Sequence, residues 1–493
     1  MLSTFYILVK ERKINLSQDK SQAEVLKEKL FFNQKNAWEE CQNEVEKAFE
    51  VCEEYKQYLD RGKTEREFTD LVVQELKKSG YQDMNELFNQ KKQLTKGAKV
   101  YYINKYKSIA FAILGDKPLA DGINMVGAHI DAPRLDIKQN PLYEDSGLVL
   151  LKTHYYGGIK KYQWVTIPYS LHGVIVRADG SKIEVSIGEG ENDPVFTITD
   201  LLPHLAQDQM QKKVSEAVTG EGLNILLGSM PYNDKKAKDK VKINILKILN
   251  EKYGLIEEDF LSAELEAVPA FKAKDIGLDR SMVGAYGQDD RVCAYSCVKA
   301  MIEAQVSSRT ALCILTDKEE IGSVGNTGAQ SNMLRSFVSK LMYLTEGSYS
   351  DVLLHECMEN SFMLSADVNP GVDPNYDGVY DKRNASYMGN GVVVQKYTGS
   401  RGKYDASDAS AEFMGRLRKL FNDNGIIWHT AELGKVDQGG GGTIAQYVAN
   451  LGVEVIDCGV PILSMHSPVE ITSKIDVYMC YKAMKLFLEK CAQ

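Results

Sequence analysis

Two histidines and six carboxylates directly follow apolar runs of the sequence, and together they could bind metal ions. They lie in five short segments: His129 and Asp131 in GAHIDAPRL, Asp289 and Asp290 in YGQDDRVCA, Glu319 and Glu320 in LTDKEE, Asp367 in LSADVNP, and His466 in LSMHSP. Zinc, cobalt and manganese accept imidazole and carboxylate ligands together, whereas calcium and magnesium seldom use two histidines. These residue types therefore favour a site for two such metal ions.

The spacing within two of these segments indicates that neighbouring residues have different roles, one binding metal and the other supporting the ligand or acting as a base. A carboxylate two residues from a ligating histidine can accept the second ring N–H and fix the tautomer, and Asp131 stands at that distance from His129. In the adjacent pair Glu319–Glu320, one carboxylate can bind a metal ion while the other takes a proton from water. Such a pair is typical of a metal-dependent hydrolase.

Each segment also has a simpler interpretation. A His-x-Asp spacing occurs by chance, the pair Asp289–Asp290 could cap the following helix, and the pair Glu319–Glu320 could form a solvated turn. Asp367 could be a loop residue and His466 a structural one. Five such segments, each after a strand-like run, are harder to explain separately, because ligands of open α/β sheets bind beyond the carboxyl ends of strands. The spacing alone leaves both interpretations open.

The elements that would position these residues follow from hydrophobic periodicity. Apolar residues at three- and four-residue intervals predict an amphipathic helix over residues 36–60, and TERE predicts a second helix capped at Thr64. Strands are expected in YYINKYKSIAFAIL and INMVGAHID. After residue 265, helices and strands alternate through RTALCILT and VEVIDCG to a final helix. This alternation favours an α/β fold with a largely parallel sheet covered on both faces.

The middle of the chain has a different pattern. Short alternating strands begin near residue 146, and GVIVRADGSKIEVSI predicts a hairpin that turns at Asp179-Gly180. A helix is expected in VKINILKILNEKYG. We therefore predict an inserted β-rich domain over 146–264, an α/β domain over 31–145 and 265–493, and an N-terminal segment over 1–30, for which an extended conformation is one option.

Composition argues against several other classes of protein. A net charge of −9 opposes nucleic-acid binding, since neutralising phosphates requires a basic face. The apolar opening LSTFYILV is too short to span a membrane, and the chain lacks the basic start of a signal peptide. The nine cysteines are scattered and form no CxxC motif, so we expect reduced core residues in a cytoplasmic protein. There is no GxSxG, GxGxxG or GxxxxGK motif.

Seven segments taken in order resemble a known family. GAHIDAPRL, YGGIKKYQW, YGQDDRVCA, DKEEIGSVGNTGAQS, SADVNPGVDPNY, KYTGSRGKY and LSMHSP are similar to the motifs of the aspartyl aminopeptidase and aminopeptidase I family of dinuclear zinc exopeptidases, close to its bacterial branch. The resemblance implies a three-layer α/β/α zinc-peptidase domain of phosphorylase/hydrolase-like fold, with an inserted β-rich dimerisation domain. It further implies a homo-oligomer, a tetrahedral dodecamer built from dimers, and two zinc ions per subunit, for which cobalt or manganese could substitute.

The resemblance implies five metal ligands. One zinc ion would be bound by His129 and Asp367, the other by His466 and Glu320, and Asp289 would bridge the two.

It also implies the reaction, which is removal of the amino-terminal residue from a peptide. Asp131 would orient His129, and Glu319 would be the general base for the attacking water. The pair Asp290–Arg291 would support the bridge without binding metal. Two alternatives are another two-metal amide hydrolase, such as a deacylase or carboxypeptidase, and a catalytically silent assembly protein of the same fold.

Substrate preference is where the chain departs from the aspartyl branch. That branch tends to read Asp-Met-Ala-His before His-Pro-Asn-Tyr, whereas this chain has Asp-Val-Asn-Pro at 367–370 and Asp-Pro-Asn-Tyr at 373–376. Asp208 stands where some relatives have a histidine near a neighbouring subunit's site. A neutral or broad preference is therefore favoured over an acidic one.

Two further pairs of residues are candidates for binding the substrate. Either Lys396 or Lys403 would contact an acidic side chain or the peptide carboxylate, and the sequence does not choose between them. Gly440 and Gly441 lie in the glycine-rich loop QGGGGT, where bare main chain could approach a peptide closely or the loop could simply be mobile.

Overall fold

The computed structural model describes residues 21–306 and 308–491. The chain divides into two compact units, one ending at Lys35 and one beginning at Asn36. In the first unit, Gln22–Leu30 form helix α1, whose start is capped by Ser21 and Glu24. This part of the segment expected over 1–30 is therefore helical and not extended, because the capping box satisfies backbone groups at the helix start. Residues 1–20 of that segment lie outside the described residues.

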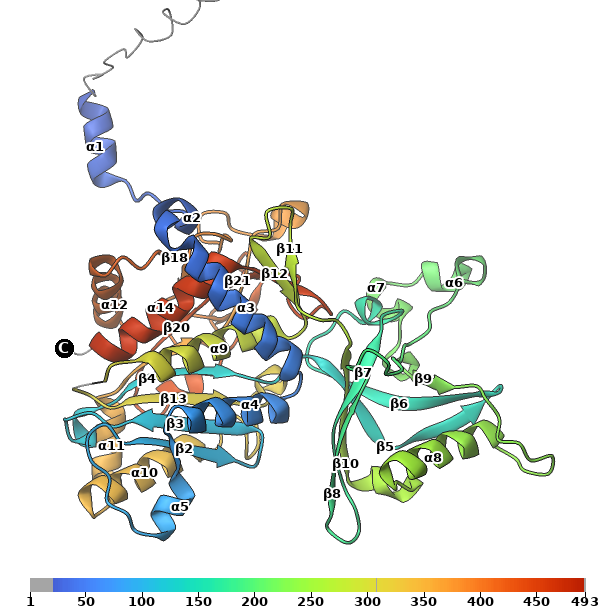
Figure 1. Cartoon of the computed structure of the whole chain (residues 1–493). Coiled ribbons are helices and arrows are strands. Elements are labelled where there is room, and N and C mark those ends of the chain that lie inside the picture. Colours follow the sequence, from blue (N-terminus) through green and yellow to red (C-terminus); the bar gives the residue numbers. More distant parts are fainter. Residues whose placement is uncertain (1–20, 307, 492–493) are drawn as a thin grey trace, which may run out of the picture. The chain divides into compact units, whose positions relative to one another are not determined.

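A nine-stranded sheet forms the centre of the second unit (Figure 1). Its strands, in spatial order, are β1 (Gln82–Asp83), β2 (Lys99–Asn104), β3 (Ser108–Ile113), β13 (Ala311–Thr316), β4 (Asn124–His129), β14 (Phe362–Ala366), β20 (Glu454–Gly459), β16 (Val392–Gln395) and β18 (Trp428–Thr430). Strands β13, β4, β14 and β20 run parallel in the middle, with antiparallel neighbours on each side. The expected parallel arrangement thus holds where the sheet is most buried.

Helices cover both faces of this sheet and complete three layers. On one face they are α3 (Val45–Arg61), α4 (Glu65–Lys78), α9 (Gln288–Glu303), α12 (Ala411–Asp423) and α14 (Lys474–Lys490). On the other face they are α5 (Met84–Asn89), α10 (Met333–Glu346), α11 (Asp351–Glu359) and α13 (Ala445–Ala449). Successive residues of β4 point to opposite sides, so Met125 packs in one core and Val126 in the other.

Local signals in the sequence explain how these elements begin and end. The predicted cap of α4 is confirmed, since Thr64 and Glu67 form a capping box. The helix predicted over 36–60 is divided into α2 (Ala37–Glu40), a single 3₁₀ turn and α3. YYINKYKSIAFAIL contains two strands, β2 and β3, because Lys105 and Tyr106 take left-handed backbone conformations at a tight turn between them.

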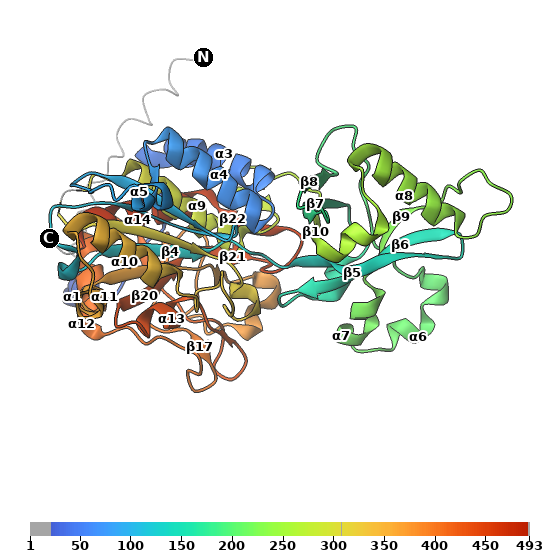
Figure 2. The same ribbon diagram turned by 90° about the horizontal axis from the view of Figure 1, so that it is seen from below.

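A second sheet of six strands, all paired antiparallel, carries the β-rich part of the chain (Figure 2). Its order is β8 (Lys182–Ile187), β7 (Tyr169–Val176), β10 (Ala263–Pro269), β5 (Arg134–Asp145), β6 (Leu148–Tyr156) and β9 (Ile225–Gly228). The predicted β7–β8 hairpin is present, and α8 (Lys240–Tyr253) packs against the sheet. The short helices α6 (Gln207–Met210) and α7 (Val214–Ala217) belong to the same region. Strand β5 lies before residue 146, and β10 begins inside the predicted range and extends past residue 264.

Two smaller sheets lie in the remaining segments. A five-stranded sheet has the order β11 (Lys274–Ile276), β12 (Met282–Ala285), β22 (Glu470–Ser473), β21 (Pro461–Leu463) and β15 (Asn369–Pro370). A two-stranded sheet pairs β17 (Gly399–Ser400) with β19 (Gly440–Gly441). Within the described ranges, every helix is too short or too polar to cross a bilayer.

All nine cysteine thiols are buried, as the sequence predicts for core residues. They are distributed over helices and strands on both sides of the central sheet, and burial raises the pKa of several of them, including Cys357 and Cys491 to about 12. The thiols whose pKa is raised stay protonated at neutral pH, and all nine buried side chains pack as small apolar groups.

Candidate metal centre

The candidate site lies at the carboxyl ends of three adjacent parallel strands. His129 ends β4 and pairs in register with Thr316, the last residue of β13. The pair Glu319–Glu320 begins the 3₁₀ turn that follows β13, and Asp367 directly follows β14. Because these strands share one direction, the residues that follow them collect at one edge of the sheet. The register thus explains why segments far apart in sequence meet here.

Asp289 and His466 reach the same place from other elements. Asp289 lies in the first turn of α9, and His466 lies between β21 and β22. Glu470, the first residue of β22, holds both: Oε2 accepts the backbone N–H of Asp289 at 3.0 Å, and Oε1 accepts that of His466 at 2.7 Å. Sequence reasoning missed Glu470, because a single glutamate in SPVEITS gives no sign of its partners.

Asp289 faces both histidines, with one carboxylate oxygen for each. Its Oδ1 lies 3.2 Å from Nε2 of His129, and its Oδ2 lies 3.1 Å from Nε2 of His466. Nε2 of His129 is also 3.9 Å from Oδ1 of Asp367, and Nε2 of His466 is 3.3 Å from Oε2 of Glu320. The five predicted ligands thus form two groups that share Asp289, and each group could hold one metal ion.

The other ring nitrogen of each histidine is held by the protein. Nδ1 of His129 lies 3.0 Å from the backbone oxygen of Asp131 and 3.3 Å from its Oδ1. Nδ1 of His466 lies 2.7 Å from the backbone oxygen of Gly158. With Nδ1–H donated in both cases, Nε2 keeps its lone pair and points toward Asp289. Both rings are therefore oriented as metal-binding imidazoles require.

The buried carboxylates of the site favour the binding of cations. Burial raises the pKa of Glu319 to about 7, and it raises those of Glu320 and Asp367 well above their ordinary values. Burial would also raise the pKa of Asp289, but in the metal-free site hydrogen bonds from His129 and His466, donated when these imidazoles are protonated at Nε2, hold it well below its usual range. Oε1 of Glu320 is buried without a hydrogen-bond partner among the described residues. Divalent cations would offset this concentration of buried negative charge, so the donor set fits zinc.

The pair Asp289–Asp290 does not cap α9. The N-cap residue is Gly287, and no side chain in the described part of the chain caps the helix start. The peptide bond between the two aspartates is cis, and Asp290 is fully buried. The adjacent Arg291 donates from Nε to the backbone oxygen of Ile130 at 3.2 Å, so it holds the segment that carries His129.

The residues predicted to bind substrate lie in two neighbouring loops. Lys396 and Lys403 both form ion pairs with Asp408, the second at 2.8 Å. Lys403 also lines a cavity of about 160 Å³ between residues 397–403 and 432–439. Gly441 and Gly440 pair with Gly399 and Ser400, which joins the two loops. The role of these residues with a substrate stays a prediction, as does that of Asp208, which is exposed in α6.

Comparison with known proteins identifies the family to which this chain belongs. The model of the aminopeptidase I zinc metalloprotease family (M18) matches residues 58–488. The chain belongs to the M18 family. It is 50% identical over 455 residues to a probable M18 family aminopeptidase 1 from Clostridium acetobutylicum, covering 92% of this chain and 98% of that protein. The chain is thus an aminopeptidase of a zinc metalloprotease family, and the predicted activity is confirmed.

Solved structures of M18 proteins share the fold. An M18 aminopeptidase from Thermotoga maritima superposes with a TM-score of 0.89 at 45% identity, covering 93% of this chain and 100% of that one. Aminopeptidase I from C. acetobutylicum gives 0.87 at 47% identity, covering 94% and 100%. The mApe1 dodecamer of S. cerevisiae, at 22% identity, has a TM-score of 0.71 over 90% of this chain and 97% of that one, which shows a common fold. The α/β zinc-peptidase fold is therefore confirmed.

Proposed function

We propose that this M18 aminopeptidase uses two zinc ions held by the two groups that share Asp289. His129 and Asp367 would bind one ion, and Glu320 and His466 the other. The observation that carries the proposal is the position of Asp289, whose two oxygens face Nε2 of different histidines at 3.2 and 3.1 Å. When bound, the zinc ions supply Lewis acidity, which acidifies a water molecule and polarises the scissile carbonyl. Cobalt or manganese offers similar chemistry with the same ligands.

Glu319 is the general base of the proposed reaction. Its carboxylate lies beside the ligand group, with Oε2 3.9 Å from Nε2 of His129, and it is not itself one of the five ligands. A carboxylate with a pKa near 7 can take a proton from the attacking water and return it to the departing amine. The backbone N–H of Glu319 donates to Oδ1 of Asp131 at 3.1 Å, which fixes the backbone of Glu319. Asp131 thus holds both the backbone of the general base Glu319 and the ring of His129.

Substrate binding is proposed for the adjoining loops. Gly440 and Gly441 would present main-chain groups to the peptide, while Lys396 and Lys403 are the candidates to meet a carboxylate. Both lysines are already paired with Asp408, which offsets their charge and supports a neutral or broad preference over an acidic one.

We also propose how the protein assembles and where it acts. The β-rich domain over 146–264 would form dimers, since exposed apolar side chains gather along its residues 201–214, and dimers would build a dodecamer like that of mApe1. Nine buried thiols support a reducing, cytoplasmic location. The partners would be peptide substrates and further copies of the chain.

A panel of amino-acid p-nitroanilides and matched N-acetylated controls tests the function. Metal-free protein and protein reloaded with zinc, cobalt or manganese are assayed in parallel. We expect metal-dependent cleavage of free-amine substrates only, with neutral residues cleaved at least as fast as acidic ones. Cleavage of the acetylated controls, or activity that survives complete metal removal, would contradict the proposal.

A further inference from the structure

The residues at the end of β6 contact both halves of the proposed metal centre. The hydroxyl of Tyr156 donates to Oδ2 of Asp131 at 2.8 Å, and Asp131 lies behind His129. Two residues later, the backbone oxygen of Gly158 accepts from Nδ1 of His466. Between them, Gly157 has φ +76°, and a Cβ there would lie 3.3 Å from Oε2 of Glu320. The last residue of β6 and the two glycines that follow it therefore lie against residues of both ligand groups.

Asp131 uses both of its carboxylate oxygens fully. Oδ1 accepts the backbone N–H of Glu319 and lies 3.3 Å from Nδ1 of His129. Oδ2 accepts the backbone N–H of Glu320 at 3.2 Å and the hydroxyl of Tyr156. Because a carboxylate accepts about four hydrogen bonds, these donors together fix its rotation. Tyr156 is the one side-chain donor among them that belongs to the six-stranded sheet.

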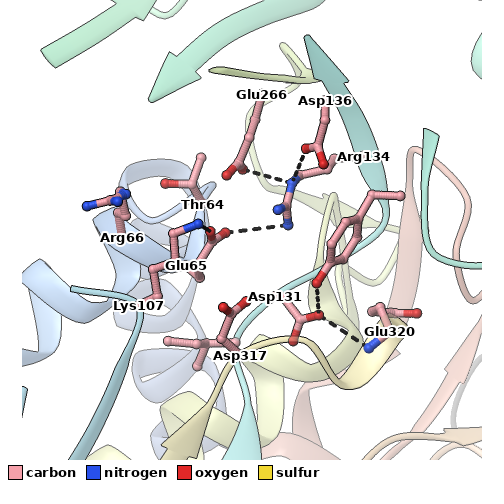
Figure 3. Close-up of polar contacts among 12 residues, drawn as sticks. Thr64, Glu65, Arg66, Lys107, Asp131, Arg134, Asp136, Glu266, Asp317 and Glu320 are labelled. Atoms are coloured by element: carbon pink, nitrogen blue, oxygen red, sulfur yellow. Dashed lines mark hydrogen bonds and ion pairs between the residues drawn. The ribbon is translucent and has the colours of Figure 1, made fainter. Parts of the chain in front are cut away.

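The ring of Tyr156 is held in turn by Arg134. The guanidinium of Arg134 stacks 3.8 Å from the centre of the ring. Three carboxylates surround the same guanidinium, at 2.8 Å for Asp136, 3.2 Å for Glu266 and 3.4 Å for Glu65 (Figure 3). Arg134 and Glu65 are almost completely buried, so the group is screened from solvent. The ring is therefore fixed on the side away from the metal centre.

We propose that Tyr156 is a positioning residue of the aminopeptidase reaction: held by Arg134, it fixes the carboxylate of Asp131 that orients His129 and the backbone of Glu319 and Glu320. The inference rests on the proposed function of these residues. Its consequence is that the six-stranded sheet helps to set the geometry of the metal centre, although it supplies none of the five ligands. Burial keeps the hydroxyl of Tyr156 protonated, because it raises the pKa well above its usual value.

Tyr156→Phe in the zinc-loaded enzyme tests the inference, because it removes one hydroxyl and keeps the ring on Arg134. Without this donor, Oδ2 loses a partner and the carboxylate of Asp131 can rotate. We expect kcat to fall about tenfold while KM changes less than about twofold, and zinc loss to a chelator to become about tenfold faster. The visible spectrum of the cobalt-loaded variant should also change. Tyr155→Phe is the matched control, since Tyr155 is half-exposed on the same strand, and it should match the wild type.

Activity is expressed per bound zinc in the folded oligomer isolated by gel filtration, so that a loss of folded protein is not counted as a loss of catalysis. Wild-type kcat and wild-type zinc retention in Tyr156→Phe would overturn the inference, even if the melting temperature fell. Should that variant not yield folded protein, Arg134→Lys keeps the positive charge but removes the planar stack, and it should change kcat and zinc retention in the same direction.

His129→Ala distinguishes a wrong ligand set from a wrong positioning role of Tyr156. If this variant kept both zinc ions and full activity, the proposed ligand set would be wrong. If it lost zinc while Tyr156→Phe behaved as wild type, the ligand set would stand and only the positioning role of Tyr156 would fail.

Discussion

Oε2 of Glu470 accepts a hydrogen bond of 3.0 Å from the backbone N–H of Asp289. The other oxygen accepts from the backbone N–H of His466, so one side chain fixes two proposed ligands from different elements. Both partners are donors, and only a carboxylate can accept from both without turning a donor of its own toward one of them.

Glu470→Gln should weaken zinc binding. The glutamine can offer its oxygen to one backbone N–H, but its NH₂ group then faces the other, so one of the two hydrogen bonds is lost. We expect about tenfold weaker zinc binding, measured by competition with a chromophoric chelator. Glu454→Gln is a suitable control, because Glu454 accepts from Ser410. Equal zinc retention in the Glu470 variant and the wild type would show that this contact does not support the site.

Glu319→Gln should remove activity and leave the metals in place. The amide has nearly the same shape but cannot take a proton, so we expect kcat to fall by about 10²–10⁴-fold. Zinc content, measured by elemental analysis, should equal that of the wild type. Substantial residual hydrolysis at full zinc content would exclude Glu319 as the base.

Metal content should depend on which ligand is lost. His466→Ala removes a ligand from one group only, so we expect zinc to fall from about two to about one per subunit. Asp289→Ala removes the residue shared by both groups, and here zinc should fall below about one. Metal analysis after gel filtration measures both. Equal zinc content in the two variants would contradict the shared position of Asp289.

Gly440→Ala should disturb the substrate loops. Gly440 has φ +135°, and a Cβ there would lie 2.5 Å from the Cα of Ser400, so any side chain would force β17 and β19 apart. We expect a severalfold rise in KM with zinc content unchanged. Gly402→Ala is a control in the same region, because a Cβ there meets nothing within 4 Å. If both variants kept the wild-type KM, the paired loops would not contribute to substrate binding.

His429 should make stability depend on pH. Burial lowers the pKa of His429 to about 4, and its two ring nitrogens contact the backbone N–H of Tyr387 and the backbone oxygen of Asn390. The unfolded chain binds a proton below about pH 6.5, whereas the folded chain does so only near pH 4, so stability is lost as the pH falls between these values.

The neutral variant His429→Gln lacks this titration. At about pH 7.5 we expect it to be less stable than the wild type, because it loses ring packing and hydrogen bonds. The difference should shrink by about 2 kcal/mol as the pH falls to about 5, since only the wild type loses stability through this group. Denaturant unfolding at several pH values measures the difference. A difference that stays constant with pH would mean that His429 has an ordinary pKa.

Much of the site could be predicted because its residues follow strongly apolar runs. β4 and β13 are buried at every position, so their sequences mark both the strands and the points where they end. His129 and Glu319 could thus be placed at the edge of a sheet before its order was known.

The supporting contacts could not be predicted, because they join residues that no local pattern connects. Glu470 meets Asp289 only after β22 pairs with β12, and Tyr156 meets Asp131 only after β6 pairs with β5. Lys396 and Lys403 were likewise equivalent candidates, and no local pattern indicated that both would contact one aspartate. Such pairings depend on register and on strand order, which hydrophobic periodicity does not determine.

The burial of all nine cysteines has a consequence for how the protein opens. A thiol-specific reagent can reach a cysteine only when the surrounding segment separates, so each thiol records the rate of its own exposure. Cys41, which follows α2, retains 8% exposure, whereas Cys297 lies fully enclosed within α9. Labelling should therefore proceed in an order that follows depth, with Cys41 modified early and Cys297 only on complete unfolding. The nine cysteines thus act as built-in reporters of local and global unfolding.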